Sequence, residues 1–321
     1  MIGRDRVMAL FAKQPTDRVG YWSGAPHPDT ARIYGAALGV AGESDTRSAV
    51  ELAVALGDDA IWIPAEWDAW NAPDGSPIWP APELEEWIGF ESCVFAQTED
   101  VSEVEAYAWP DPAHFDFAPI EQQMRDAHRA GLAVLGGPWC SVSTVLMGLF
   151  GTEELLVKMH THPEVVEAVT EHVTEFYVAA VRRFFTEVQE YPEVFFFASD
   201  LGTQQDLLMS PQMFRRFIKP SLAAIAAAAG TFGLPIMLHS CGAVSKLIPD
   251  FLEMGVSGLH PLQARARGMG AAELSAYKDD LVFVGGVDTQ DLLPHATPVD
   301  VRAEVSRLKE TFGERFVVSP S

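Results

Sequence analysis

The chain has 321 residues, 48% of them hydrophobic and 21% charged, so it can bury a core and is not intrinsically disordered. Its 45 acidic and 22 basic residues give a net charge of −23, which disfavours nucleic-acid binding because such a surface repels phosphate. Three scattered cysteines exclude a disulfide framework. With no signal peptide and no uninterrupted membrane span, the chain is predicted to be cytoplasmic.

Short apolar runs of strand-like composition alternate with longer stretches that have helical spacing, which is typical of an α/β protein. There are eight such runs, the number that a closed (β/α)8 barrel, or TIM barrel, requires. The runs are apolar on both faces, as parallel strands buried on both sides should be. In chain order, we predict strands at Arg18–Gly24, Ala60–Trp67, Leu132–Gly137, Val194–Asp200, Pro235–Ser240, Gly258–Gln263, Val282–Asp288 and Phe316–Ser319.

The connecting segments carry recognisable helix starts. Ser210-Pro211 and Thr297-Pro298 each place an N-cap before a proline, and Pro163 begins a long helix that should run to about Val188. Between Asp68 and Pro112 repeated Trp, Pro and Gly break the alternation, and 89–100 reads as one short strand there. We interpret 68–112 as an irregular insertion after strand 2, within a single domain that spans 1–321.

The sequence stops just past the eighth predicted strand, so the pattern predicts no helix after strand 8. A complete barrel would cover that strand with a final helix. The uncovered apolar face favours a homodimer or a longer native chain.

Polar residues at the carboxyl ends of the strands are informative, because these ends form the active face of a parallel barrel. The predicted ends carry a concentration of acidic, imidazole, thiol and amide groups. They include Glu66, Asp68, Trp139, Cys140, Asp200, His239, Cys241, His260, Gln263, Asp288 and Ser319.

The sharpest of these features is His239-Ser240-Cys241-Gly242. Residues two apart in an extended chain point the same way, so the imidazole and the thiol should face together, a pair that suits Zn²⁺. The dipole of the following helix should favour a Cys241 thiolate. The alternative is a buried His and Cys that only fill space. A catalytic zinc needs a third ligand, for which Cys140, Glu66, His260 and Asp288 are candidates.

Two aspartates close apolar strands, Asp200 after VFFFAS and Asp288 after VFVGGV. Each could be a proton-transfer base, a substrate anchor or a helix N-cap. His260 is as consistent with a structural role as with a functional one. The sequence lacks GxGxxG after a strand, a Walker A loop, GxSxG and HExxH, so nucleotide-driven and serine-hydrolase chemistry lose support.

The segments PIMLHSCGAVSKLIPDFLEMG and FVGGVDTQDLLPHATPVDV carry a family resemblance, supported by RDRVMALFAKQPTDRVGYW near the N-terminus. The chain resembles the uroporphyrinogen decarboxylase superfamily of (β/α)8 barrels, which also contains zinc-dependent methyltransferases that serve corrinoid proteins. True decarboxylases carry an Arg-rich RQAGRY-like signature, whereas the corresponding SGAPHPDTARIY has only Arg32. The methyltransferase branch carries His-x-Cys and a late Cys as zinc ligands. His239 and Cys241 match the first two, and no Cys stands at the SPS end.

The resemblance favours a zinc-dependent methyltransferase that moves a methyl group between a small methylated substrate or thiol and a corrinoid on a partner protein. His239 and Cys241 would hold zinc, and Asp200 and Asp288 would orient substrate or transfer protons. Glu66, Asp68, Trp139, His260 and Gln263 would contact the substrate. The alternative is a metal-free decarboxylase of a tetrapyrrole-like substrate, with Asp68 or Asp200 stabilising a protonated pyrrole. A third hypothesis is a non-catalytic barrel that binds a corrinoid or a metabolite.

Overall fold

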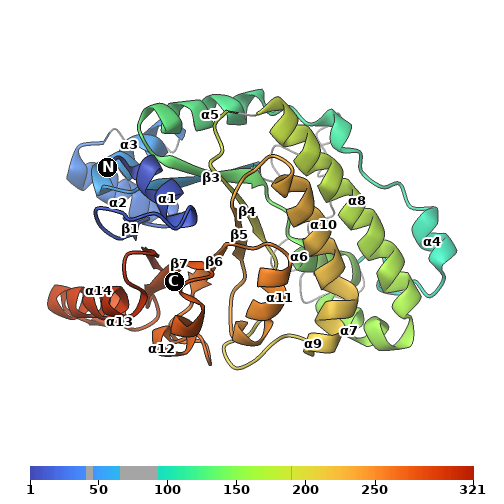
Figure 1. Cartoon of the computed structure of the whole chain (residues 1–321). Coiled ribbons are helices and arrows are strands. Elements are labelled where there is room, and N and C mark those ends of the chain that lie inside the picture. The colour runs from blue at the N-terminus through green and yellow to red at the C-terminus, as the bar shows by residue number, and fades with distance from the viewer. Residues whose placement is uncertain (41–45, 66–92, 189) are drawn as a thin grey trace.

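The computed structural model describes residues 1–40, 46–65, 93–188 and 190–321. Its eight parallel strands form one curled sheet in the order β1-β8-β7-β6-β5-β4-β3-β2, the (β/α)8 architecture that the sequence predicts (Figure 1). All eight predicted strands are confirmed, although the first is only two residues long. Their bounds are β1 Gly20–Tyr21, β2 Ala60–Ala65, β3 Ala133–Pro138, β4 Val194–Ala198, β5 Ile236–His239, β6 Gly258–Leu262, β7 Val282–Val287 and β8 Phe316–Pro320.

Helices fill the segments between the strands. The predicted long helix is α8, Pro163–Glu187, and the Thr297 cap begins α14, Pro298–Phe312, with a complete capping box. The Ser210 cap begins α9, Pro211–Met213, which continues as the π-helix η5, Phe214–Ile218, and α10, Lys219–Gly230. The others are α1 Gly3–Phe11, α2 Pro28–Leu38, α3 Thr46–Leu56, α4 Val101–Glu105, η4 Pro112–His114, α5 Ala118–Arg129, α6 Val142–Phe150, α7 Thr152–Thr161, η6 Ser245–Leu247, α11 Ile248–Glu253, α12 Ala271–Leu274, η7 Ser275–Tyr277 and α13 Leu292–His295.

Alternation along each strand separates the barrel interior from the layer that faces the helices. On β4, Phe196 belongs to the small interior cluster, whereas Phe195 and Phe197 pack in the larger outer cluster. On β5, Met237 points inward, so the two-residue period places His239 inward at the carboxyl end of the same strand. The interior is therefore apolar along its length and becomes polar at the end where the predicted site residues lie.

Helix α1 closes the opposite end of the barrel. Its Val7 and Leu10 pack into the interior cluster, and Arg4 N donates to Gly131 O at 2.8 Å. A ligand can therefore reach the interior from the carboxyl-end face but not from this one.

Strands β1 and β2, at the two ends of the strand order, meet at what we call the seam of the barrel. Here side-chain hydrogen bonds replace part of the backbone pairing between strands. Asp59 N donates to Tyr21 O at 2.8 Å, and the Asp59 carboxylate accepts Tyr21 N at 2.9 Å. The Asp58 carboxylate accepts Ser23 N at 2.8 Å. The same Asp59 carboxylate binds Arg6 and Arg18, so two consecutive buried aspartates hold the seam together.

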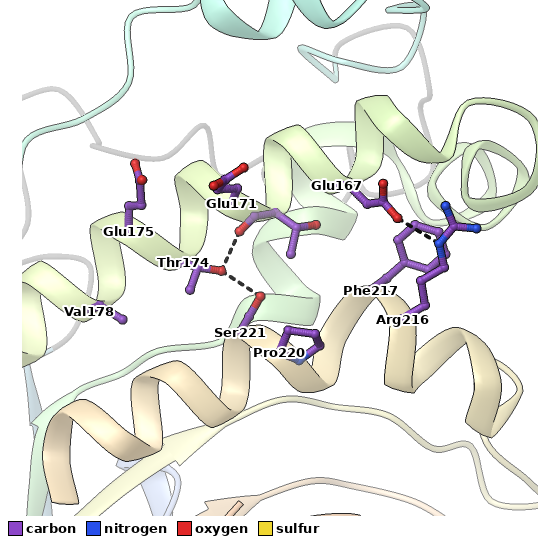
Figure 2. A pocket seen from close by; sticks show the side chains of 10 residues that line it. Glu167, Glu171, Thr174, Glu175, Val178, Arg216, Phe217, Pro220 and Ser221 are labelled. Atoms are coloured by element: carbon purple, nitrogen blue, oxygen red, sulfur yellow. Dashed lines mark hydrogen bonds and ion pairs between the residues drawn. The ribbon is translucent and has the colours of Figure 1, made fainter.

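The longest helix, α8, packs against α10 on the outer wall, and a surface groove of about 410 Å³ lies between them (Figure 2). Thr174 Oγ1 donates to Ser221 Oγ at 2.7 Å, and Arg216 Nε lies 2.8 Å from Glu167 across the groove. These contacts join the two helices across the groove. The groove therefore serves helix packing and lies on the outer wall, away from the strand ends.

The predicted insertion 68–112 is only partly described, and 68–92 lie outside the described residues. The short strand expected at 89–100 is wrong for its described part, because residues 94–97 form a turn. The remainder holds α4 and η4. None of the described helices is both long enough and apolar enough to span a membrane.

Candidate metal centre

The His-x-Cys pair lies at the end of β5, and both side chains face the same way. Pairing of β5 with its two neighbours fixes the backbone here, since Ser199 N donates to His239 O at 2.9 Å and Ser240 N donates to His260 O at 2.8 Å. Cys241 Sγ lies 3.4 Å from His239 Nε2. The prediction that the imidazole and the thiol project together is confirmed.

Asp200 completes a group of three side chains that could hold a metal ion. Its Oδ1 accepts Cys241 N at 2.9 Å and lies 3.5 Å from His239 Nε2. One ligand atom from each of Asp200, His239 and Cys241 lies within 4.8 Å of the other two. Nitrogen, sulfur and oxygen are all zinc donors, so the residues fit the metal that the sequence predicts. Asp200, which the sequence did not offer as a third ligand, is therefore the structural candidate for that position.

The other candidate third ligands lie elsewhere. Cys140 is fully buried in the outer core, where burial raises its pKa well above the usual value. The Asp288 carboxylate accepts Gln290 N and Leu292 N and lies 3.5 Å from Arg265, which makes it a turn and helix cap. His260 contacts His239 through Nδ1 and is not among the three clustered ligands. Glu66, like Asp68, lies outside the described residues.

Burial determines the protonation of this group. It lowers the pKa of His239, and it lowers that of His260 well below the usual value, so both imidazoles are neutral at neutral pH. Burial, together with the Asp200 carboxylate, raises the pKa of Cys241 to about 12. The expectation that a helix dipole favours a thiolate is wrong here, because η6 begins only at Ser245 and an acid lies nearer.

Aromatic rings form the floor beneath the polar group. Phe196 lies at its centre, with the ring centroid of Trp139 at 5.3 Å and that of His260 at 5.4 Å. Trp139 also lies 5.8 Å from His239, and Trp22 lies 5.2 Å from His260. A ligand at the metal centre would therefore meet aromatic faces below it, and Trp139 lies where the sequence expected a substrate contact.

Gln263 holds the loop that carries Cys241. Its Oε1 accepts Gly242 N at 2.6 Å. Gly242 has φ of +86°, and a Cβ there would lie 2.3 Å from the carbonyl carbon of Gly202, so two loops cross with no room for a side chain. The contact gives Gln263 a positioning role that its place at a strand end did not reveal.

The fold and the site together define a parallel (β/α)8 barrel protein with a candidate metal centre at the carboxyl ends of its strands. The family model described as "Uroporphyrinogen decarboxylase (URO-D)" matches residues 97–321, and the chain belongs to this family. A curated relative from Methanosarcina mazei, "Methylated-thiol--coenzyme M methyltransferase", is 26% identical over 163 residues, which are 49% of this chain and 40% of the relative. The chain thus matches less than half of that relative's length.

A solved structure titled "methyltransferase from Methanosarcina mazei" superposes on the chain with a TM-score of 0.67 at 17% identity. The match covers 99% of this chain and 92% of that one. At this identity the likeness establishes the fold, and it extends over the whole barrel.

Proposed function

We propose that the chain is a zinc-dependent methyltransferase, which moves a methyl group between a small methylated substrate or thiol and a corrinoid carried by a partner protein. The observation that carries the proposal is the clustering of Asp200, His239 and Cys241 within 4.8 Å at the barrel mouth. The name of the curated relative, "Methylated-thiol--coenzyme M methyltransferase", supports it.

His239 Nε2, Cys241 Sγ and Asp200 Oδ1 would hold the metal, and Trp139 and Phe196 would exclude water from one side of the substrate. When bound, zinc supplies Lewis acidity that keeps a thiol substrate deprotonated at neutral pH. In the thiol-accepting direction, the substrate sulfur attacks the methyl carbon, a carbon–sulfur bond forms, and the electron pair of the carbon–cobalt bond stays with the corrinoid. Asp288 caps a helix at the same rim, and a substrate-orienting role for it stays a prediction.

Zinc analysis by mass spectrometry tests the metal. The purified wild type should hold about one zinc per chain, and His239→Ala and Cys241→Ser should hold far less. Cys93→Ser is the matched control, since Cys93 is a free thiol that is not among the three clustered ligands. Equally low zinc in the wild type and both site variants would refute the metal centre.

Methyl transfer is tested separately, with methylcobalamin as the methyl donor and small thiols as acceptors. The expected result is thiol-dependent loss of methylcobalamin absorbance that needs His239 and Cys241. Turnover of uroporphyrinogen without methyl transfer would instead identify the decarboxylase. Corrinoid binding with no turnover of either kind would favour the non-catalytic barrel.

A further inference from the structure

A cavity of about 580 Å³ lies beside the seam between β1 and β2, bordered by α2, α3 and the loop that follows β1. Much of its wall is small or aliphatic, including Ala25, Ala49 and Leu52. Trp22 and Trp62 also border it. The volume is that of a small-molecule site, and none of the functional roles assigned above uses it.

Among the described residues of the wall, one charged group is buried, Asp58, which is 7% exposed. Its carboxylate accepts Ser23 N at 2.8 Å and Ser23 Oγ at 2.7 Å. Within the described parts of the chain, no Lys, Arg or His forms an ion pair with it; the nearby Arg18 pairs with Asp59 instead. Buried carboxylates are normally paired, so this one lacks a cation.

The other described charged groups of the wall do not supply that cation. Arg32 has a side chain that is 71% exposed, and it lies 3.7 Å from the Asp29 carboxylate, with which it pairs. Burial raises the pKa of Asp58 to about 6, so at neutral pH most of the carboxylate is charged and poorly solvated. A positively charged ligand in the cavity would relieve this cost.

Two further features favour a cation. Trp22 and Trp62 border the cavity, and indole rings attract alkylated cations through their quadrupoles, as in aromatic cages for quaternary ammonium groups. In addition, the chain carries a net charge of −23. The resulting negative potential attracts cations and repels anions.

We propose that this cavity binds a small organic ammonium ion, with its nitrogen paired to the Asp58 carboxylate and its alkyl groups against Trp22 and Trp62. The proposal goes beyond methyl transfer, because binding at Asp58 needs neither the metal nor a reaction. The cavity and the metal centre share a wall, since Trp22 lies 5.2 Å from His260 and Trp62 lies 4.8 Å from Trp139, ring centroid to ring centroid.

Calorimetric titration of the full chain tests the proposal, with choline as the cation and 3,3-dimethylbutanol as its neutral isostere. The wild type should bind choline at least 10-fold more tightly than the isostere. Asp58→Asn should abolish that preference while leaving isostere binding unchanged. Asp29→Asn removes an exposed carboxylate from the same cavity wall and should retain the preference, which controls for general attraction by the acidic surface.

A second variant, Ala49→Trp, keeps the test decisive if Asp58→Asn is unstable, because Ala49 is exposed and its replacement narrows the cavity without disturbing the core. It should lose both ligands. Equal binding of choline and the isostere by the wild type, or unchanged choline binding by Asp58→Asn, would overturn the proposal. Choline binding by a protein that holds no zinc and transfers no methyl group would support this site and refute the proposed function.

Discussion

The Nδ1 atoms of His239 and His260 lie 2.8 Å apart, so one imidazole donates a proton in this contact and the other accepts it. Because His239 Nε2 faces Asp200 and Cys241, the proposed metal would leave the proton of the neutral ring on His239 Nδ1. His260 would then be the acceptor and would fix the tautomer and ring orientation of His239, as partners of metal-bound histidines commonly do.

His260→Ala should therefore weaken zinc affinity by about 10- to 100-fold without removing the site, since the three ligands stay in place. Competition with a chromophoric chelator measures the affinity. His260→Gln, which restores an acceptor, should recover part of it. His172→Ala is the control, since His172 stacks on Trp109 and pairs with Glu105 away from the strand ends. Unchanged affinity in His260→Ala would contradict the orienting role.

The loop crossing at Gly242 yields a stability prediction. Gly242→Ala should lower the free energy of unfolding by about 2–4 kcal/mol, because the new Cβ meets the Gly202 backbone and φ is +86°. Chemical denaturation measures the change. Gly230→Ala is the matched control: nothing lies within 4 Å of its Cβ, so the substitution should leave stability equal or raise it by up to about 1 kcal/mol. Similar midpoints for the two variants would contradict the crowding.

Asp58 makes the stability depend on pH. Its folded-state pKa of about 6 lies above the unfolded value near 3.9, so the folded state favours the protonated form. The resulting stabilisation is fully present below about pH 4 and is lost as the pH rises through about 6, for a total of up to about 3 kcal/mol. Denaturation series at several pH values should show the unfolding free energy of Asp58→Asn rising relative to that of the wild type as the pH rises through about 6. A constant difference across this range would contradict the shift.

The neighbouring Asp59, unlike Asp58, pairs with arginine side chains, and these ion pairs should stabilise the fold. Asp59→Ala removes one of the two carboxylates that pair with Arg6, whose side chain is 5% exposed, together with the contact to Arg18, and should cost about 3 kcal/mol of unfolding free energy. Asp126→Ala removes the partner of the exposed Arg129 at 3.7 Å and should cost less than about 1 kcal/mol. Thermal unfolding by circular dichroism measures both. Equal losses of unfolding free energy would show that the buried contacts of Asp59 stabilise the fold no more than an exposed ion pair does.

The short apolar runs, separated by longer helical stretches, were sufficient to predict all eight strands. Parallel strands buried on both faces have a distinctive composition. The pairing of His239 with Cys241 also followed from local geometry, since the two side chains belong to one extended segment. Two-residue periodicity requires no knowledge of the rest of the fold.

The candidate third ligand could not be predicted from the sequence, because Asp200 reaches Cys241 only through the pairing of β4 with β5. In that pairing Ala198 lies opposite His239. The sequence placed Asp200 at a strand end, but the choice between it and Asp288 depends on the loops beyond the ends. Asp58 was missed because the doublet Asp58-Asp59 precedes its strand, on the side that barrel rules assign to stability. A charged doublet directly before an apolar run was the available signal.

The seam has a mechanical consequence. Seven neighbouring strand pairs are joined by backbone hydrogen bonds of the sheet, whereas β1 and β2 depend largely on carboxylates that accept backbone N–H groups. The contacts between β1 and β2 can therefore open locally without unfolding either strand. Amide protons of Tyr21 and Ser23 should then exchange with deuterium sooner than those of β4, which would make this junction the most compliant stretch of the cylinder.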